Sequence, residues 1–140
     1  MDSRFLLLAP LLLLAPTHKA PSPAGTWHGR WSSPDGSVYS ATATLTVTSD
    51  TAIDGSILWT LSAATRADLK PKIGQSGTEY VRGVFHVDCR TLHMAGYRLD
   101  DPSKILGTDQ YELILAPNSA GLGGVTGNSG AWTGMISLLR

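Results

Sequence analysis

The stretch YSATATLTVT, residues 39–48, decides the fold class. Apolar and hydroxyl residues alternate along it, and in an extended chain every second side chain points to the same side. One face carries Tyr39, Ala41, Ala43, Leu45 and Val47, and the other carries only Ser and Thr. Such a segment places one face in a core and the other in water. The sequence predicts a half-buried β-strand here.

The same alternation recurs along the chain, and no segment shows the 3.6-residue spacing of an amphipathic helix. It predicts about eight strands, at residues 25–32, 37–48, 52–62, 79–87, 92–98, 109–116, 121–126 and 131–140. Short turns join most of them. The two longer connections are residues 63–77, in which one helical turn is expected before Lys70-Pro71 ends it, and residues 99–108.

An antiparallel meander with an even number of strands can curl until its first and last strands pair, which leaves no open edge. The predicted fold class is therefore all-β, a single antiparallel up-and-down β-barrel or strongly curled meander of about eight strands. One hairpin also predicts its own register. If residues 88–91 form the turn, apolar residues pair with apolar residues across the hairpin, and polar residues pair with polar ones. The pairs are then Phe85 with Met94, Val87 with Leu92, and His86 with His93.

The phrase Gly-x-Trp-x-Gly occurs twice, at residues 25–29 and 130–134. In a closed meander the first and last strands are neighbours. We therefore expect the two phrases to lie side by side, with Trp27 and Trp132 buried near one end of the barrel. The alternative is a coincidence of two frequent residue types.

A Gly-x-Trp on the first strand, here Gly25-Thr26-Trp27, and a basic residue on the last strand, here Arg140, form a recognisable pair. The combination resembles the calycin pattern of lipocalins and avidins. The chain length and the Ser/Thr-rich second strand are more similar to avidins than to full lipocalins. The resemblance implies an eight-stranded up-and-down barrel with Arg140 as the partner of Trp27.

The first residues differ from the rest. Residues 5–15 form a short apolar run interrupted by Pro10, and small residues precede Gly25. This pattern is typical of a secretory signal, so residues 1–24 are interpreted as a signal peptide and short leader. Residues 25–140 are then one barrel domain of a secreted or periplasmic protein. A retained membrane anchor is the alternative. The Ser/Thr outer face of residues 39–48 argues against a barrel embedded in lipid.

The 140 residues include 11 basic and 11 acidic ones, so the formal net charge is zero, and no basic block stands out. This balance argues against a nucleic-acid partner and against a polybasic membrane surface. The single cysteine, Cys89, cannot form a disulfide within the chain. The domain must therefore be stabilised by its core.

Inward-facing aromatic residues are the candidate ligand-binding set. They are Trp27, Trp31, Tyr39, Trp59, Phe85, Tyr111 and Trp132. Rings in a barrel mouth make an apolar cup for a small ligand. The alternative is that they only fill the narrow interior of an eight-stranded barrel. Small inward residues such as Ala41 and Gly134 leave room for an open cup, so both interpretations stay open.

Other chemistry is weakly indicated. His86, His93 and Asp88 share the expected outer face and have the chemistry of a zinc site, but a solvated polar face is the preferred interpretation. Cys89 lies on a turn with no helix N-terminus to lower its pKa, so it is interpreted as a non-catalytic thiol. No acid, base and nucleophile assemble on one face. We therefore expect no enzyme activity, no cofactor and no metal.

Two functions follow from these residues. The first is an exported, non-enzymatic binding module that takes a small, partly apolar ligand in the barrel mouth. The alternative is a protein-interaction or protease-inhibitor-like barrel that acts through its long loops, residues 63–77 and 99–108.

Overall fold

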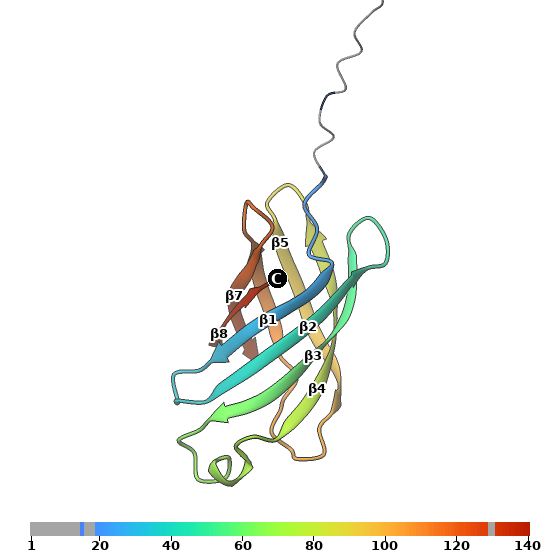
Figure 1. Cartoon of the computed structure of the whole chain (residues 1–140). Coiled ribbons are helices and arrows are strands. Elements are labelled where there is room, and N and C mark those ends of the chain that lie inside the picture. Colours follow the sequence, from blue (N-terminus) through green and yellow to red (C-terminus); the bar gives the residue numbers. More distant parts are fainter. Residues whose placement is uncertain (1–14, 16–18, 129–130) are drawn as a thin grey trace, which may run out of the picture.

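Eight strands close into one antiparallel barrel (Figure 1). The structure is a computed structural model that describes residues 15, 19–128 and 131–140, with the side chains of residues 131 and 132 outside the description. The strands are β1 (Gly25–Ser32), β2 (Val38–Val47), β3 (Ala52–Ala63), β4 (Ser76–His86), β5 (Thr91–Asp100), β6 (Gln110–Leu115), β7 (Gly121–Asn128) and β8 (Ala131–Leu139). Each pairs with the next, and β8 pairs with β1. The predicted all-β, up-and-down barrel is confirmed.

The core fills the barrel interior and follows the predicted alternation. On β2 the buried side chains are Tyr39, Ala41, Ala43 and Leu45. On β3 they are Ile53, Ile57, Trp59 and Leu61, and on β6 they are Tyr111, Leu113 and Leu115. Val47, at the end of β2, is 39% exposed and lies outside the core. The apolar face of each strand is buried against the faces of the others, which is the principal stabilising term of such a fold.

The first and last strands pair as expected, but the two Gly-x-Trp-x-Gly phrases do not lie side by side. The β1–β8 register places Gly29 opposite Leu138 and Trp31 opposite Ile136. The backbone of Trp132 pairs instead with Gly127 of β7, near the start of β8. Antiparallel neighbours bring the start of one strand against the end of the other. The two phrases therefore lie toward opposite ends of the barrel, and that part of the expectation is wrong.

The end of β8 does meet Trp27 through Arg140. The Arg140 guanidinium lies over the Trp27 ring, with Cζ 4.3 Å from the ring centroid. It also donates hydrogen bonds to the carbonyl oxygens of Ala24 (2.7 Å), Ser22 (3.0 Å) and Ser119 (2.7 Å). The tryptophan and arginine that carry the resemblance to calycins are thus in contact. They tie the segment before β1 to the end of β8.

The β4–β5 hairpin has the predicted faces but not the predicted register. Phe85 pairs with Leu92, and His93 pairs with Val84, a shift of two residues from the expected pairs. The turn is residues 87–90, closed by a hydrogen bond from the Arg90 N–H to the Val87 carbonyl oxygen. A shift of two residues keeps every side chain on its face. Phe85 and Leu92 are therefore still buried.

The β3–β4 connection contains one short 3₁₀ helix, η1 (Lys70–Lys72). The expected helical turn is present, but it includes Pro71, whereas the sequence predicted that it would end there. Proline is tolerated in the first turn of a helix because the N–H it lacks has no partner within that turn. No helix among the described residues has the length and apolar character needed to cross a membrane.

Candidate functional site

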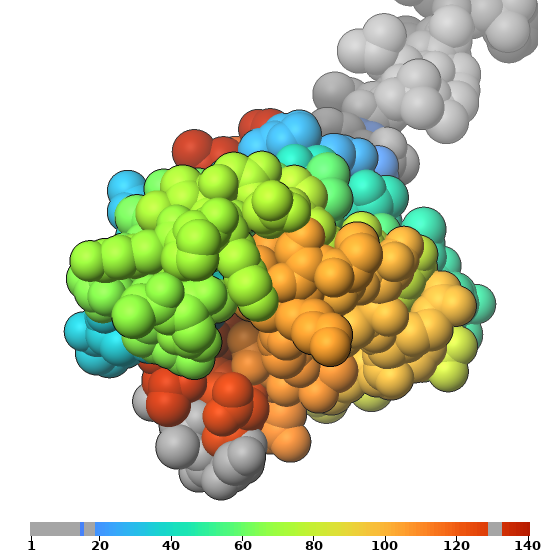
Figure 2. Space-filling model, turned by 90° about the horizontal axis from the view of Figure 1, so that it is seen from below, coloured from blue at the N-terminus to red at the C-terminus, as the bar shows by residue number. Residues whose placement is uncertain are grey.

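A cavity of about 580 Å³ opens at one end of the barrel. The β1–β2 turn and the β3–β4 and β5–β6 connections surround it, at the lower end in Figure 1. Figure 2 looks onto this end, where the β3–β4 connection (green) and the β5–β6 connection (orange) cover much of the opening. The volume lies within the range of small-molecule pockets.

Three aromatic side chains from adjacent strands form one wall of the cavity: Trp31, Tyr39 and Trp59. Their rings meet edge to face, with centroids 5.5 Å apart for Trp31 and Tyr39 and 6.1 Å apart for Tyr39 and Trp59. This arrangement suits the charge distribution of aromatic rings. It follows from the register, since Trp31 pairs with Tyr39, and Trp59 pairs with Ala41, two residues from Tyr39 on the same inward face of β2.

The polar atoms of this wall are used inside the protein. Trp31 Nε1 donates a hydrogen bond to Thr126 Oγ1 (2.6 Å), and the Tyr39 hydroxyl donates one to the carbonyl oxygen of Ile105 (2.6 Å). Gly134 makes room for the first contact, because a Cβ there would lie 2.3 Å from Trp31 Nε1. The rings are fixed in place and offer the cavity mainly their carbon surface.

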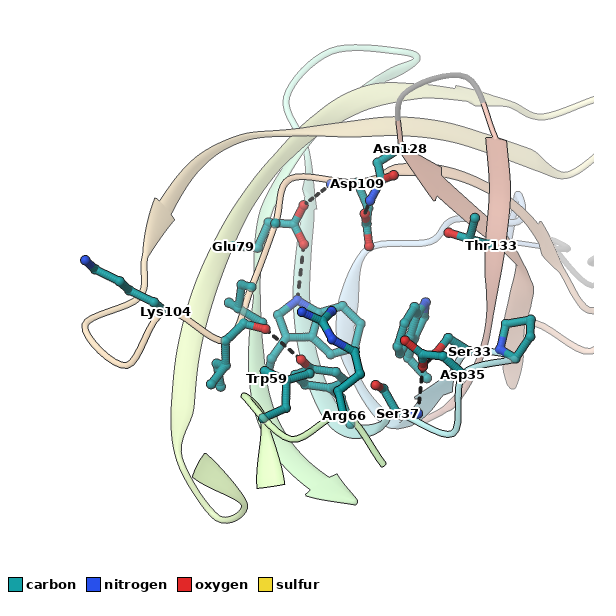
Figure 3. Close-up of a pocket in the computed structure, with 17 residues that line it drawn as sticks. Ser33, Asp35, Ser37, Trp59, Arg66, Glu79, Lys104, Asp109, Asn128 and Thr133 are labelled. Carbon is teal, nitrogen blue, oxygen red and sulfur yellow. Dashed lines mark hydrogen bonds between the residues drawn. The ribbon is translucent and has the colours of Figure 1, made fainter. Parts of the chain in front are cut away.

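The second wall contains Glu79, an acidic side chain that is only 1% exposed. It lies on the inward face of β4, in the same alternation as Val81 and Phe85. Its Oε2 accepts hydrogen bonds from Trp59 Nε1 (3.2 Å) and from the Tyr111 hydroxyl (2.5 Å). Its Oε1 accepts one from the backbone N–H of Asp109 (2.9 Å), as Figure 3 shows.

These donors do not cancel the effect of burial. Removing the Glu79 carboxyl from water raises its pKa from 4.5 to about 7, although the hydrogen bonds from Tyr111, Asp109 and Trp59 lower it. Burial also raises the pKa of Tyr111, and the neighbouring Glu79 charge adds to that effect. Near neutral pH, Glu79 is divided between its charged and neutral forms.

Asp109 lies beside Glu79 on this wall, just before β6. Burial raises the pKa of its carboxyl from 3.8 to about 6. A long contact from Asn128 Nδ2 to Asp109 Oδ1 (3.5 Å) acts in the opposite direction and lowers the pKa. Figure 3 shows Asp109 and Asn128 close together on the β7 side of the cavity. The wall therefore has two neighbouring acidic groups in a partly dry environment.

Charged side chains also stand at the rim. Asp35 and Arg66 line the opening and are exposed. A hydrogen bond from Ser33, together with one from the Ser37 backbone, lowers the pKa of Asp35. The Ser37 hydroxyl is 3% exposed and makes no hydrogen bond to the described residues.

The structure divides the seven aromatic residues of the predicted ligand-binding set. Trp31, Tyr39 and Trp59 line the cavity. Tyr111 is buried behind Glu79, and its hydroxyl is bonded to that carboxyl. Trp27 and Phe85 are buried toward the other end of the barrel, and the Trp132 side chain lies outside the described residues. As ligand contacts, these residues remain a prediction.

The acidic wall was missed from the sequence, although one signal was present. Glu79 shares its face with Val81 and Phe85, so the alternation along β4 places an acid inside the barrel. The rim residues carry no such signal, because loops bring them together.

The expected outer-face histidines do meet, with the His86 and His93 rings edge to face and 5.5 Å between centroids. Cys89 is exposed and free. Within the described ranges, no three His, Cys, Asp or Glu side chains are grouped to hold a metal ion.

Comparisons with known proteins support the fold. No family model matches the chain, and no curated protein matches it. The chain is similar to a solved redesigned β-barrel, mFAP1, bound to DFHBI, with a TM-score of 0.63 and 19% identity over 84% of this chain and 94% of that chain. It is also similar to a second redesigned β-barrel, mFAP0, bound to DFHBI, with a TM-score of 0.60 and 18% identity over 84% of this chain and 98% of that chain. The chain therefore has the closed, eight-stranded, antiparallel architecture of a calycin-like β-barrel.

Proposed function

We propose that the protein is a non-enzymatic binding protein that takes a small, partly apolar ligand at the open end of its barrel. The cavity of about 580 Å³, with three fixed aromatic rings on one wall and two carboxyl groups on another, carries the proposal. Apolar walls with a few placed polar groups are typical of small-molecule sites. The two similar barrels, mFAP1 and mFAP0, each hold the small molecule DFHBI, which supports a ligand at this kind of fold.

The long connections support the cavity. Asp101 accepts hydrogen bonds from the backbone N–H groups of Ile105 (3.1 Å) and Leu106 (2.8 Å), which shapes the β5–β6 connection. Lys72 Nζ donates a hydrogen bond to the Lys104 carbonyl oxygen (3.3 Å) and so joins the two connections. Loops tied to each other over a cavity favour a ligand pocket. Capture of a protein partner by these loops is the alternative function.

Export is part of the proposal. The apolar run at residues 5–15, followed by small residues before Gly25, supports a signal peptide and a secreted or periplasmic protein. The first strand begins at Gly25. Mass spectrometry of the mature protein from its own host is the test. A mature chain that begins near Gly25 supports export, whereas a chain that keeps residues 1–24 contradicts it.

The binding test is a calorimetric titration of the protein with a panel of small aromatic metabolites and lipids. Thr133→Phe places a bulky side chain in the cavity and is expected to weaken binding at least tenfold. Thr44→Phe makes the same change on the exposed face of β2 and is expected to leave binding unchanged. The proposal is wrong if no compound binds, or if Thr133→Phe and Thr44→Phe have the same effect. The alternative, capture of a protein partner by the loops, would be favoured if a protein binds both the unaltered chain and Thr133→Phe but no longer binds after deletion of residues 101–107.

A further inference from the structure

The carboxyls of Glu79 and Asp109 lie on one cavity wall, and no basic side chain among the described residues forms an ion pair with either of them. The ion pairs found among the described residues are Arg66 with Asp68 and Arg82 with Asp54, and neither includes Glu79 or Asp109. The groups that hold Glu79 are neutral donors: an indole, a phenol and a backbone N–H. A carboxylate buried among neutral donors is less stable than one beside a cation. A positively charged ligand would supply the missing partner.

The basic residues of the rim do not fill this role. The Arg66 guanidinium is engaged by the Asp68 carboxylate through two contacts, of 3.1 Å and 2.6 Å, and its side chain is 55% exposed. Lys104 lines the opening, but Figure 3 shows its ammonium group directed away from the cavity. Figure 3 shows the Arg66 side chain extending across the opening, where Asp68 engages its guanidinium. The inner wall keeps two carboxyls that form no ion pair among the described residues.

The aromatic wall is suited to the same kind of ligand. The indole nitrogens of Trp31 and Trp59 and the hydroxyl of Tyr39 are already bonded within the protein. Ring carbon surface is what remains for a ligand. Aromatic faces attract both apolar groups and cations, so this wall accepts the body of an organic cation as well as its charged end.

We propose that the ligand is a small organic cation, a protonated amine on an aromatic or alkyl body. Its ammonium group contacts the carboxyls of Asp109 and Glu79, and its apolar body lies on the aromatic wall. This inference rests on the proposed function, because it specifies the chemistry of the ligand for the same cavity. The raised pKa values of Glu79 and Asp109 agree with it, since both reflect burial without a neutralising partner.

The test compares three probes of similar size on the unaltered protein: 2-phenylethylamine, 2-phenylethanol and 3-phenylpropanoate. Calorimetric titration at pH 8 and low salt keeps both carboxyls ionised and the amine protonated. The amine is expected to bind at least tenfold more tightly than the alcohol, and the anion more weakly than the alcohol. Because this comparison needs no substitution, it does not depend on whether a variant folds.

Two variants locate the charge effect. Asp109→Asn removes one carboxyl and keeps the backbone N–H that bonds Glu79. It is expected to reduce amine affinity about tenfold and to leave alcohol affinity within twofold. Asp50→Asn makes the same change on the exposed β2–β3 turn, at the other end of the barrel, and is expected to change neither.

The inference is overturned if the amine does not bind, if the alcohol or the anion binds as tightly as the amine, or if Asp109→Asn weakens amine and alcohol equally. Each of these results is compatible with the proposed function, provided that some panel compound binds and that Thr133→Phe weakens its binding. If no panel compound binds at all, the proposed function fails as well.

Discussion

The hydroxyl of Tyr111 on β6 donates a hydrogen bond of 2.5 Å to Oε2 of Glu79 on β4, with both side chains buried in the barrel. The bond joins strands that are not neighbours in the sheet, since β5 lies between them. It holds an acidic group at the inner wall of the cavity without neutralising it. The stability of the barrel and the ligand chemistry proposed for it therefore involve the same carboxyl.

The stability of the barrel is expected to fall as the pH rises from about 5 to about 7. Glu79 has a pKa of about 7 in the folded protein and an ordinary value near 4.5 when unfolded, so the folded state binds more protons between these values. Stability is full below the unfolded pKa, decreases through this window, and is constant above it. A shift of this size corresponds to at most about 3–4 kcal/mol. Urea unfolding at pH 5, 6, 7 and 8, followed by circular dichroism, measures it.

A matched pair of variants assigns this pH dependence. Glu79→Gln is expected to reduce the slope of the stability profile, most clearly between pH 6 and 7, because the Asp109 carboxyl, with a pKa of about 6, still titrates at lower pH. Glu112→Gln makes the same change on the exposed face of β6 and is expected to keep the slope. Equal slopes for the unaltered protein and Glu79→Gln would show that Glu79 is not the group responsible.

Gly96→Ala is expected to destabilise the barrel and displace Glu79. A Cβ at position 96 would lie 2.0 Å from Glu79 Oε1 and 2.9 Å from its carboxyl carbon. Overpacking of this kind typically costs about 1–3 kcal/mol. Gly121→Ala is the control, because its Cβ would meet its nearest neighbour, Ala116 Cβ, at 3.5 Å, an ordinary contact. Thermal melting distinguishes the two, and equal melting temperatures would contradict the packing described for Glu79.

Arg140→Ala is expected to reduce the free energy of unfolding by about 1–3 kcal/mol, because charge-assisted hydrogen bonds to three carbonyl oxygens and the stacking on Trp27 are lost together. Arg98→Ala removes a similar stacking contact, on the Tyr80 ring at 3.9 Å. Its expected cost is below about 1 kcal/mol. Urea unfolding compares them. A loss for Arg140→Ala no larger than that for Arg98→Ala would mean that Arg140 does not help to close the barrel.

Removal of residues 131–140 is expected to cause aggregation. Without β8, the paired edges of β1 and β7 are both exposed, and an open apolar sheet edge is a template for pairing with other chains. Size-exclusion chromatography with light scattering measures the outcome. A monomeric truncated chain that melts like the intact protein would show that β8 is not needed to close the barrel.

The strands were predictable because burial of one face imposes a period of two, as in residues 39–48. The barrel followed from the number of strands and their short connections. The β4–β5 register was displaced by two residues because faces alone do not distinguish shifts of two; the length of the turn at residues 87–90 does.

The candidate site was only half predictable. Trp31, Tyr39 and Trp59 were visible as inward aromatic residues. The contacts of Glu79 with Tyr111 and Asp109 join parts of the chain about 30 residues apart, and no local pattern encodes them. The prediction that Trp27 and Trp132 are neighbours was wrong because it considered that β1 and β8 are adjacent but not that they run in opposite directions.

The central claim is that ligands bind at the open end of the barrel and not near Trp27, at the other end. The most direct test is a nitrogen-15 NMR titration of the indole N–H signals with 2-phenylethylamine. Each indole reports its own site, since Trp31 is bonded to Thr126, Trp59 to Glu79, and Trp27 to the Pro23 carbonyl oxygen. The account predicts that the Trp31 and Trp59 signals move with saturation while the Trp27 signal stays. Movement of the Trp27 signal without the other two, or no movement of any of the three, would contradict it.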